Sequence, residues 1–282
     1  MSKELKSAQT NNNSNDVHMN SHEYRTSDLY AGYDSKTILQ NVNITIPEGK
    51  VSVILGSNGC GKSTLLKTMA RLISPSKGAV LLDGKAITSY PSKQLAKTIG
   101  LLPQSPLVPD GITVSDLVSR GRFPYQPLLG GLTEDDYRII AESIETLGIT
   151  EIADRNVDEL SGGQRQRVWI AMALAQQTEI LLLDEPTTYL DVAYQIDILE
   201  KLKELNKARN ITIVMVLHDI NLSARYADHI FAMKKGQLVC EGSPHDVITK
   251  ENIHAIYSMD SEIIEDPVYH TPMVVPIGHL GR

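Results

Sequence analysis

The chain has 282 residues, which is enough for one large domain or two small ones with a sizeable core. Its hydrophobic fraction of 41% and charged fraction of 22% are ordinary for a globular protein. No apolar run approaches the roughly 20 residues needed to span a bilayer. The net charge of −7 argues against a chain that coats nucleic acid. Cys60 and Cys240 form no CxxC pair, which excludes a disulfide framework and favours a reducing compartment.

The start of the chain differs in character from the remainder. Residues 1–26 contain the polar stretch QTNNNSND and few apolar residues, so we expect a disordered tail there. From residue 27 onward, strand-length apolar pieces such as VNITIPEGKVSVILG appear, and KSTLLKTMARLI comes next with helical spacing.

The middle of the chain, from about residue 105 to 177, is predicted to be mostly helical. VSDLVSRGRF has the pattern of a short helix followed by a loop rich in proline and glycine. TEDDYRIIAESIETLGI begins with a cap at Thr133 and an acidic first turn, and Gly148 ends it. ELSGGQRQRVWIAMALAQQ supplies another helix, whose Ser-Gly-Gly start directs backbone N–H groups at an anion.

Strands and helices alternate in the last third of the chain. EILLLDE and ITIVMVLHD are continuous apolar runs, typical of strands buried on both faces. VAYQIDILEKLKELNKA lies between them as an amphipathic helix, and DHIFAMKKGQLVCEG predicts two strands joined by a turn at Lys235-Gly236. This alternation predicts an α/β fold with a mainly parallel sheet and helices on both faces.

The stretch GSNGCGKST matches the phosphate-loop pattern G-x-x-x-x-G-K-[ST] and stands between a buried strand and a helix. Its glycines let successive backbone N–H groups bend around a polyphosphate. Lys62 is expected to neutralise the β and γ phosphates, and Ser63 to ligate Mg²⁺. The alternative, an ordinary glycine-rich turn, is disfavoured because spacing and context both fit. The predicted cradle consists of Gly56, Ser57, Asn58, Gly59, Cys60, Gly61, Lys62, Ser63 and Thr64.

Titratable residues end the two later buried strands. Asp184 and Glu185 follow ILLL at the carboxyl edge of the sheet, where ligands bind in open α/β folds. Asp184 is expected to hold Mg²⁺ and Glu185 to polarise the attacking water as a general base. His218 ends IVMVL on the same edge, and a neutral imidazole there would donate a hydrogen bond to the γ phosphate. The alternatives are an acidic turn at Asp184 and Glu185 and a solvent-facing histidine at His218. The phosphate loop in the same chain disfavours both.

Together with LSGGQRQR, these motifs closely resemble the nucleotide-binding subunit of an ABC transporter. The resemblance covers roughly residues 27–250, and its most specific part is the signature Ser161, Gly162, Gly163 and Gln164. It implies a P-loop NTPase fold of ABC type: an α/β protein with a mainly parallel core sheet, an N-terminal antiparallel β subdomain and the helical insert. The implied division is a tail at 1–26, an ATPase domain at 27–259 and a C-terminal extension at 260–282, in which MVVPI looks like a strand.

The resemblance also implies further site residues. Gln104 matches the Q-loop glutamine, which contacts Mg²⁺ and the attacking water. Tyr33 lies where the family has an aromatic residue that stacks on adenine, although Tyr30 is close by and either could simply pack. Asp191 matches the acid that acts across a dimer interface. The implied enzyme is an ATPase with ATP and Mg²⁺ as cofactors, with catalytic residues Glu185, His218 and Gln104, and with Mg²⁺ ligands Ser63, Gln104 and Asp184.

One ATP needs only one cradle, yet the signature is a second anion-binding motif. In the family, two subunits meet head to tail, and each Ser-Gly-Gly faces the γ phosphate held by its partner. The implied assembly is a homodimer in the ATP-bound state, two separate membrane permease subunits, and an indirect link to an extracytoplasmic substrate-binding protein. No nucleic acid partner is expected, and the implied location is peripheral, on the cytoplasmic face of the cell membrane.

Two segments point to the cargo. GRFPY, with Arg122, Phe123 and Tyr125, resembles the GRxPH/Y segment of ATPases from iron-siderophore, haem and cobalamin importers. The stretch DEPTTYLD resembles the corresponding stretch in the ATPases of siderophore importers. We therefore expect uptake of iron(III)-siderophore, with haem, cobalamin, or zinc and manganese as alternatives. An ABC-type ATPase acting on DNA or the ribosome is disfavoured because there is one cassette and no long heptad run. A non-hydrolysing binding module is disfavoured because Glu185, His218 and the signature are all present.

Overall fold

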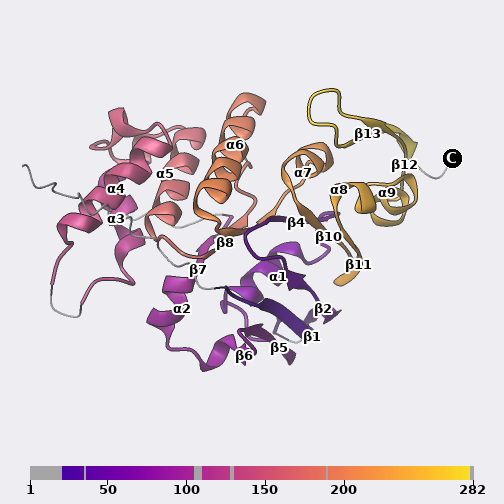
Figure 1. Cartoon of the computed structure of the whole chain (residues 1–282), viewed down its shortest axis with the longest axis horizontal. Helices are drawn as coiled ribbons and strands as arrows, with labels where there is room; N and C mark the ends of the chain where they lie inside the picture. The colour runs from indigo at the N-terminus through magenta and orange to yellow at the C-terminus, as the bar shows by residue number, and fades with distance from the viewer. Residues whose placement is uncertain (1–20, 35, 105–109, 128–129, 189, 280–282) are drawn as a thin grey trace, which may run out of the picture.

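The computed structural model describes residues 21–279 apart from 35, 105–109, 128–129 and 189 (Figure 1). In this part of the chain the strands form three sheets. The largest is the core sheet, in the order β11-β10-β4-β9-β8-β7. Its strands are β4 (Val51–Gly56), β7 (Ile99–Leu102), β8 (Ile180–Asp184), β9 (Thr212–Val216), β10 (His229–Lys234) and β11 (Gln237–Gly242).

The core sheet is mainly parallel, as predicted. Strands β10, β4, β9, β8 and β7 pair in parallel, and β11 joins β10 antiparallel through the predicted turn at Lys235-Gly236. Both residues of this turn have positive φ, 48° and 80°, which suits a tight hairpin between right-twisted strands. Alternate side chains of β4, β8 and β9 enter two separate apolar clusters, one on each face of the sheet. Because both of their faces are buried, these strands have continuous apolar sequences.

The second sheet is antiparallel and runs β2-β1-β5-β6, with β3 paired to β1. Its strands are β1 (Tyr24–Tyr33), β2 (Lys36–Val42), β3 (Thr45–Ile46), β5 (Lys77–Leu82) and β6 (Lys85–Ala86). Helix α1 (Lys62–Met69) contacts both β1 and the core sheet. A short 3₁₀ turn, η1 (Ile87–Ser89), and helix α2 (Ser92–Thr98) lead to β7.

The predicted boundary of the N-terminal tail at residue 26 is wrong for its last residues. Strand β1 begins at Tyr24, whose ring is 1% exposed and whose hydroxyl donates to the Met69 carbonyl at 2.6 Å. Its neighbours Arg25 and Ser27 point outward, so the polar composition of this stretch hid a half-buried strand. Residues 21–23 of the predicted tail are described but precede the strand, and residues 1–20 lie outside the described residues.

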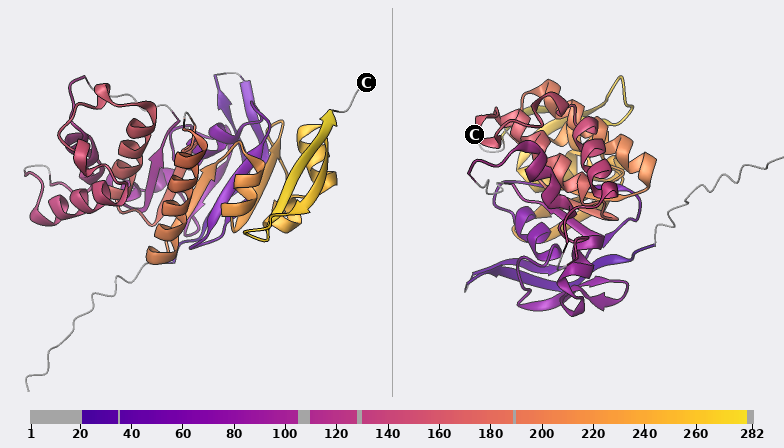
Figure 2. Two further views of the ribbon diagram at one scale, coloured as in Figure 1. Left: turned by 90° about the horizontal axis from the view of Figure 1, so that it is seen from above. Right: turned by 90° about the vertical axis from the view of Figure 1, so that its left-hand side faces the viewer.

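The helical insert lies between β7 and β8 in sequence and at one end of the molecule (Figures 1 and 2). Its helices are α3 (Val114–Ser119), η2 (Arg120–Arg122), α4 (Glu134–Thr146), η3 (Thr150–Ile152), η4 (Val157–Glu159) and α5 (Gly162–Ala175). The cap predicted at Thr133 is present: its hydroxyl accepts from the amide of Asp136, whose carboxylate accepts from the Thr133 amide. Gly148 comes just after the helix with φ 61°, as a C-terminal stop requires.

The remaining helices are α6 (Val192–Arg209), α7 (Ile220–Tyr226), α8 (Pro244–Val247) and α9 (Lys250–Tyr257). The chain then forms the third sheet, a hairpin of β12 (Met259–Glu265) and β13 (Pro272–His279), and the expected strand MVVPI lies in β13. Strand β12 packs on α9 and β13 on α7, at the end opposite the helical insert (Figure 2). Across the described ranges, no helix is both long and apolar enough to cross a membrane.

Candidate active site

Four neighbouring strands carry the predicted catalytic residues to one edge of the core sheet. The phosphate loop comes directly after β4, and His218 comes two residues after the end of β9. Asp184 is the last residue of β8, Glu185 comes next, and Gln104 lies two residues beyond β7. Because parallel strands end at the same edge, residues far apart in sequence meet there.

The phosphate loop needs glycine for two different reasons. A side chain at Gly56 would place its Cβ 2.3 Å from the carbonyl oxygen of Met233 on the adjacent strand. Gly61 caps α1 with φ 108°, a conformation that residues with a side chain rarely adopt. Lys62 is buried, and its ammonium donates to the carbonyls of Gly56 at 2.8 Å and Ser57 at 3.2 Å. A third N–H then stays available for a phosphate oxygen.

An open cavity of about 530 Å³ lies over this loop. It is lined by Tyr33, Ile38, Asn58, Gly59, Gly61, Lys62, Ser63, Thr64, Gln104, Glu185 and His218. Every one of these except Ile38 is a residue that the sequence predicted. Ile38 lies in β2 of the antiparallel sheet, and no motif marks it.

Tyr33 ends β1 and is 48% exposed in this cavity, in keeping with its predicted role under adenine. The competing Tyr30 instead lies beneath the Lys77 ammonium, 5.2 Å from the ring centroid. Cys60 is buried, and burial raises the pKa of its thiol, although nearby Lys62 opposes the shift. The thiol therefore stays protonated and packs as a small apolar group.

Glu185 is the centre of the hydrogen-bond network in the cavity. One carboxylate oxygen lies 2.6 Å from Nε2 of His218, and the other accepts from Gln104 at 2.6 Å and Thr188 at 3.0 Å. Burial acts to raise the pKa of Glu185, but the hydrogen bonds from His218, Thr188 and Gln104 outweigh it and lower the pKa. Glu185 is thus ionised at neutral pH, which is the state that a general base requires.

Besides Ile38, sequence reasoning missed Thr188, a polar residue that contacts Glu185. It lies in the turn DEPTT, three residues after Glu185, and its amide also donates to the Glu185 carbonyl at 3.3 Å. A hydroxyl three residues after a carboxylate in a tight turn is the signal that was available. Glu185 itself has φ 55°, in the left-handed region, and the turn holds it there.

The residues at the base of the cavity fit a magnesium ion. Asp184 is fully buried, and its Oδ1 accepts from the Ser63 hydroxyl at 2.8 Å. Its Oδ2 is buried and has no hydrogen-bond partner among the described residues. Burial raises the pKa of Asp184, against the hydrogen bond from Ser63. A divalent cation would satisfy the orphaned oxygen, and carboxylate, hydroxyl and amide oxygens are the donors that Mg²⁺ prefers.

The signature and Asp191 lie elsewhere, and none of them lines this cavity. Ser161 caps α5: its hydroxyl accepts from the Gln164 amide at 3.3 Å, and the Gln164 side chain accepts from the Ser161 amide at 3.1 Å. A side chain added at Gly163 would contact Leu190 at 3.3 Å, and Gly162 opens the helix. Asp191 caps α6 by accepting from the amide of Tyr194 at 3.1 Å. The structure thus separates the two anion motifs within one chain.

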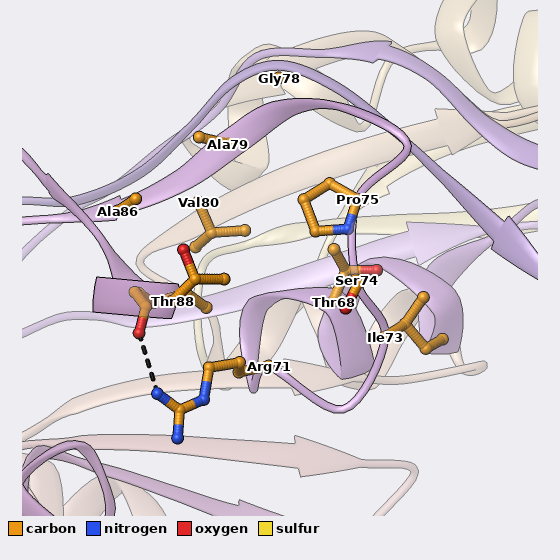
Figure 3. A pocket seen from close by; sticks show the side chains of 11 residues that line it. Thr68, Arg71, Ile73, Ser74, Pro75, Gly78, Ala79, Val80, Ala86 and Thr88 are labelled. Atoms are coloured by element: carbon orange, nitrogen blue, oxygen red, sulfur yellow. Dashed lines mark hydrogen bonds between the residues drawn. The ribbon is translucent and has the colours of Figure 1, made fainter. Parts of the chain in front are cut away.

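A second cavity, of about 170 Å³, lies between α1 and the antiparallel sheet (Figure 3). Its lining is mostly small and apolar, with Arg71 as its charged residue. The Arg71 guanidinium donates to the carbonyls of Ile87 and Tyr90 and to the Ser92 hydroxyl, so its role is to join these segments. None of the residues that line it is an acid, a histidine or a cysteine.

A phosphate loop on a mainly parallel sheet, a paired acid and histidine on the same edge, and an inserted helical subdomain define the class of ATP-binding cassette ATPases. Residues 39–188 match the model of the ABC transporter family, and the chain belongs to that family. As a member it binds ATP and hydrolyses it.

Relatives of known name extend the match along most of the chain. The chain is 50% identical over 254 residues to the ferric enterobactin transport ATP-binding protein FepC of Escherichia coli (strain K12), covering 90% of this chain and 94% of that protein. It is 50% identical over 248 residues to the iron(3+)-hydroxamate import ATP-binding protein FhuC of Bacillus subtilis (strain 168), covering 88% and 92%.

A solved structure shows how such cassettes assemble. The dimeric post-hydrolysis state of the ATP-binding cassette MJ0796, bound to ADP and Pi, superposes with a TM-score of 0.70 at 31% identity. The match covers 78% of this chain and 98% of that one. The fold expected for the core is thereby confirmed.

Proposed function

We propose that this protein is the ATP-hydrolysing subunit of an importer that takes iron(III)-siderophore across the cytoplasmic membrane through a separate permease. The observation that carries the proposal is the 50% identity, over about nine tenths of the chain, to FepC and FhuC, which are named for ferric enterobactin and iron(3+)-hydroxamate transport. Two proteins named for different siderophores match equally well. The proposal therefore names the class of cargo and not one siderophore.

In the segment GRFPY, an exposed apolar side chain follows a buried arginine that is held by hydrogen bonds. Arg122 is 4% exposed and donates to the Asp136 carboxylate at 2.7 Å and to the Ala175 carbonyl at 2.9 Å. Its guanidinium also lies 4.0 Å from the centroid of the Tyr125 ring. The next residue, Phe123, is 68% exposed. A large apolar side chain held out in this way suits contact with another polypeptide, and we assign that contact to the permease.

The cavity supports an in-line displacement at the γ phosphate. A bound Mg²⁺, held by Ser63, Asp184 and the Gln104 amide oxygen, would neutralise phosphate charge. Glu185 takes a proton from the attacking water as the water oxygen bonds to the γ phosphorus and the bond to the β-phosphate oxygen breaks. Lys62 and His218 donate hydrogen bonds to the phosphate oxygens, and Tyr33 stacks on the adenine.

The proposed assembly contains two copies of this chain. Ser161, Gly162 and Gly163 of one copy close over the γ phosphate held by the other, and Asp191 acts across the same interface. The dimeric MJ0796 cassette supports this arrangement. Two permease subunits would hold the pair peripherally at the cytoplasmic face of the membrane, with a substrate-binding protein on the far side.

An uptake assay tests the proposal. A strain that lacks this gene should lose uptake of ⁵⁵Fe carried by ferric enterobactin or a ferric hydroxamate, and the wild-type gene should restore it. The Lys62→Ala variant should fail to restore it, because the phosphates lose their buried charge partner. The proposed cargo is wrong if both iron complexes enter at wild-type rates while uptake of haem or cobalamin is lost.

A further inference from the structure

Helix α7 connects the active site to the C-terminal hairpin. His218 and Asp219 directly precede it, and Asp219 caps it by accepting from the Leu222 amide at 2.8 Å. The helix has seven residues, too few to be stable without tertiary contacts. The orientation of the His218 side chain therefore depends on the contacts that hold α7 in place.

The β12–β13 hairpin supplies much of that hold. Arg225, in the last turn of α7, donates to one oxygen of Asp266 through two nitrogens, at 2.5 and 3.0 Å. Asn221, one turn earlier, exchanges two hydrogen bonds with the backbone of Val274 in β13, at 3.2 and 2.8 Å. Val274 is 4% exposed and belongs to the main apolar cluster. Both ends of α7 are thus fastened to the hairpin.

The hairpin turn is itself ordered for this contact. The second oxygen of Asp266 accepts from the amides of Val268 and Tyr269, at 2.9 and 3.2 Å. The Tyr269 ring lies 4.5 Å from the Arg225 guanidinium and 5.9 Å from the Tyr226 ring. Asp266 is 4% exposed, so its charge-assisted bonds to Arg225 are shielded from water and are stronger for it.

Across the described residues, the His218 side chain makes one polar contact. Its side chain is 43% exposed, and its imidazole contacts Glu185 at 2.6 Å. A displacement of about 1 Å at a catalytic group is enough to cost on the order of 100-fold in rate. We propose that the β12–β13 hairpin is a positioning element for hydrolysis: through α7, Asp266 and Asn221 keep His218 against Glu185 and the γ phosphate. The proposal rests on the role of His218 given above and not on the identity of the cargo.

The test uses the purified full-length chain and measures ATP hydrolysis, ATP affinity and thermal unfolding. Asp266→Ala should lower kcat about tenfold and leave ATP affinity within about twofold, because the phosphate loop follows a different strand. Asn221→Ala, which removes only the bonds to Val274, should act in the same direction. The matched control is Glu262→Ala on the same hairpin. Glu262 pairs with Lys250 of α9, outside α7, and both side chains are about half exposed, so kcat should not change.

A double-mutant cycle separates positioning from general destabilisation. His218→Ala should lower kcat about 100-fold, and adding Asp266→Ala or Asn221→Ala to it should lower kcat no further. A second loss of similar size in the His218→Ala background would overturn the proposal, as would wild-type kcat in both Asp266→Ala and Asn221→Ala. If His218→Ala alone hydrolyses ATP at the wild-type rate, the catalytic role assigned to His218 is wrong, and the positioning role of the hairpin is wrong with it. The proposed cargo is tested independently by siderophore uptake.

Discussion

At the scale of single residues, Glu185 shows how the backbone and the charge serve one purpose. Glu185 directly follows the end of β8 and has a left-handed φ of 55°. In this position its carboxylate contacts His218, Gln104 and Thr188. Three donors on one carboxylate keep its pKa low in spite of burial. A carboxylate with a lowered pKa stays ionised over a wide pH range, although it then binds a proton less tightly.

Replacing Glu185 by glutamine should separate binding from hydrolysis. Glutamine keeps the size and most hydrogen bonds of the side chain but cannot accept the proton of the attacking water, so kcat should fall at least about 100-fold. ATP affinity should stay close to wild type. Phosphate release and ATP-analogue binding measure the two effects, and hydrolysis at the wild-type rate would show that Glu185 is not the base.

Thr188→Ala is the milder comparison at the same position. It removes one hydrogen bond that lowers the pKa of Glu185, so the folded pKa rises. Activity that depends on ionised Glu185 is lost as the pH falls through that pKa, and the acid limb of kcat should therefore move to higher pH while the plateau persists. A pH profile of ATP hydrolysis measures the shift, and an acid limb that stays at the wild-type pH would contradict the role of Thr188.

At the scale of elements, one buried ion pair ties the helical insert together. Arg122 connects the N-terminus of α4, through Asp136, with the carbonyl of Ala175 at the C-terminus of the signature helix α5. A cation at that carbonyl end is favoured by the helix dipole. The same arginine therefore supports the exposed Phe123 and the helix that begins with the signature.

Arg122→Ala should destabilise the fold by about 3 kcal/mol, because it leaves the buried Asp136 carboxylate without its charge partner. Arg138→Ala is the matched control: it breaks pairs with Asp135 and Glu142 on the same helix, and all three side chains are between 44% and 65% exposed. Exposed pairs contribute little, so the control should unfold like wild type. Chemical denaturation measures both, and equal midpoints would contradict the role of Arg122.

The sequence predicted those parts of the site whose signal is local. The phosphate loop, Asp184, Glu185 and His218 each lie at the end of a buried strand, so spacing and strand pattern were enough. Pairings across the fold left no such signal: Arg122 with Asp136, Asp266 with Arg225, and Ile38 in the cavity wall depend on tertiary packing. The start of β1 was missed because its buried residues, Tyr24 and Thr26, include only one large apolar side chain in an otherwise polar stretch.

At the scale of the whole molecule, the signature lies apart from the chain's own cavity, and the proposed function depends on this separation. Ser161 caps α5 and is exposed, and its hydroxyl accepts from the Gln164 amide of the same helix. Its own helix thus keeps the hydroxyl in place before any partner arrives. The proposed dimer would use a surface that is already formed in the single chain, in agreement with the limited shape change typical of pre-organised interfaces.

Ser161→Arg should leave ATP binding by the single chain intact, since the cavity lies apart from residue 161. It should abolish hydrolysis that depends on the dimer, because a bulky cation at the helix start blocks the partner's phosphate. Sedimentation with ATP in the Glu185→Gln background measures the dimer, and that background should sediment as a dimer only when Ser161 is intact. A dimer formed equally well by the Ser161→Arg variant would place the interface elsewhere.

The same separation has a consequence for the rate law. If each active site needs the signature of another copy, the turnover per chain in dilute solution should increase with protein concentration and with ATP in a sigmoidal way. A permease that holds two copies side by side replaces this dependence with a fixed effective concentration, on the order of millimolar for short tethers. Chains that are not bound to a permease would then hydrolyse ATP slowly, and most ATP would be consumed by assembled transporters.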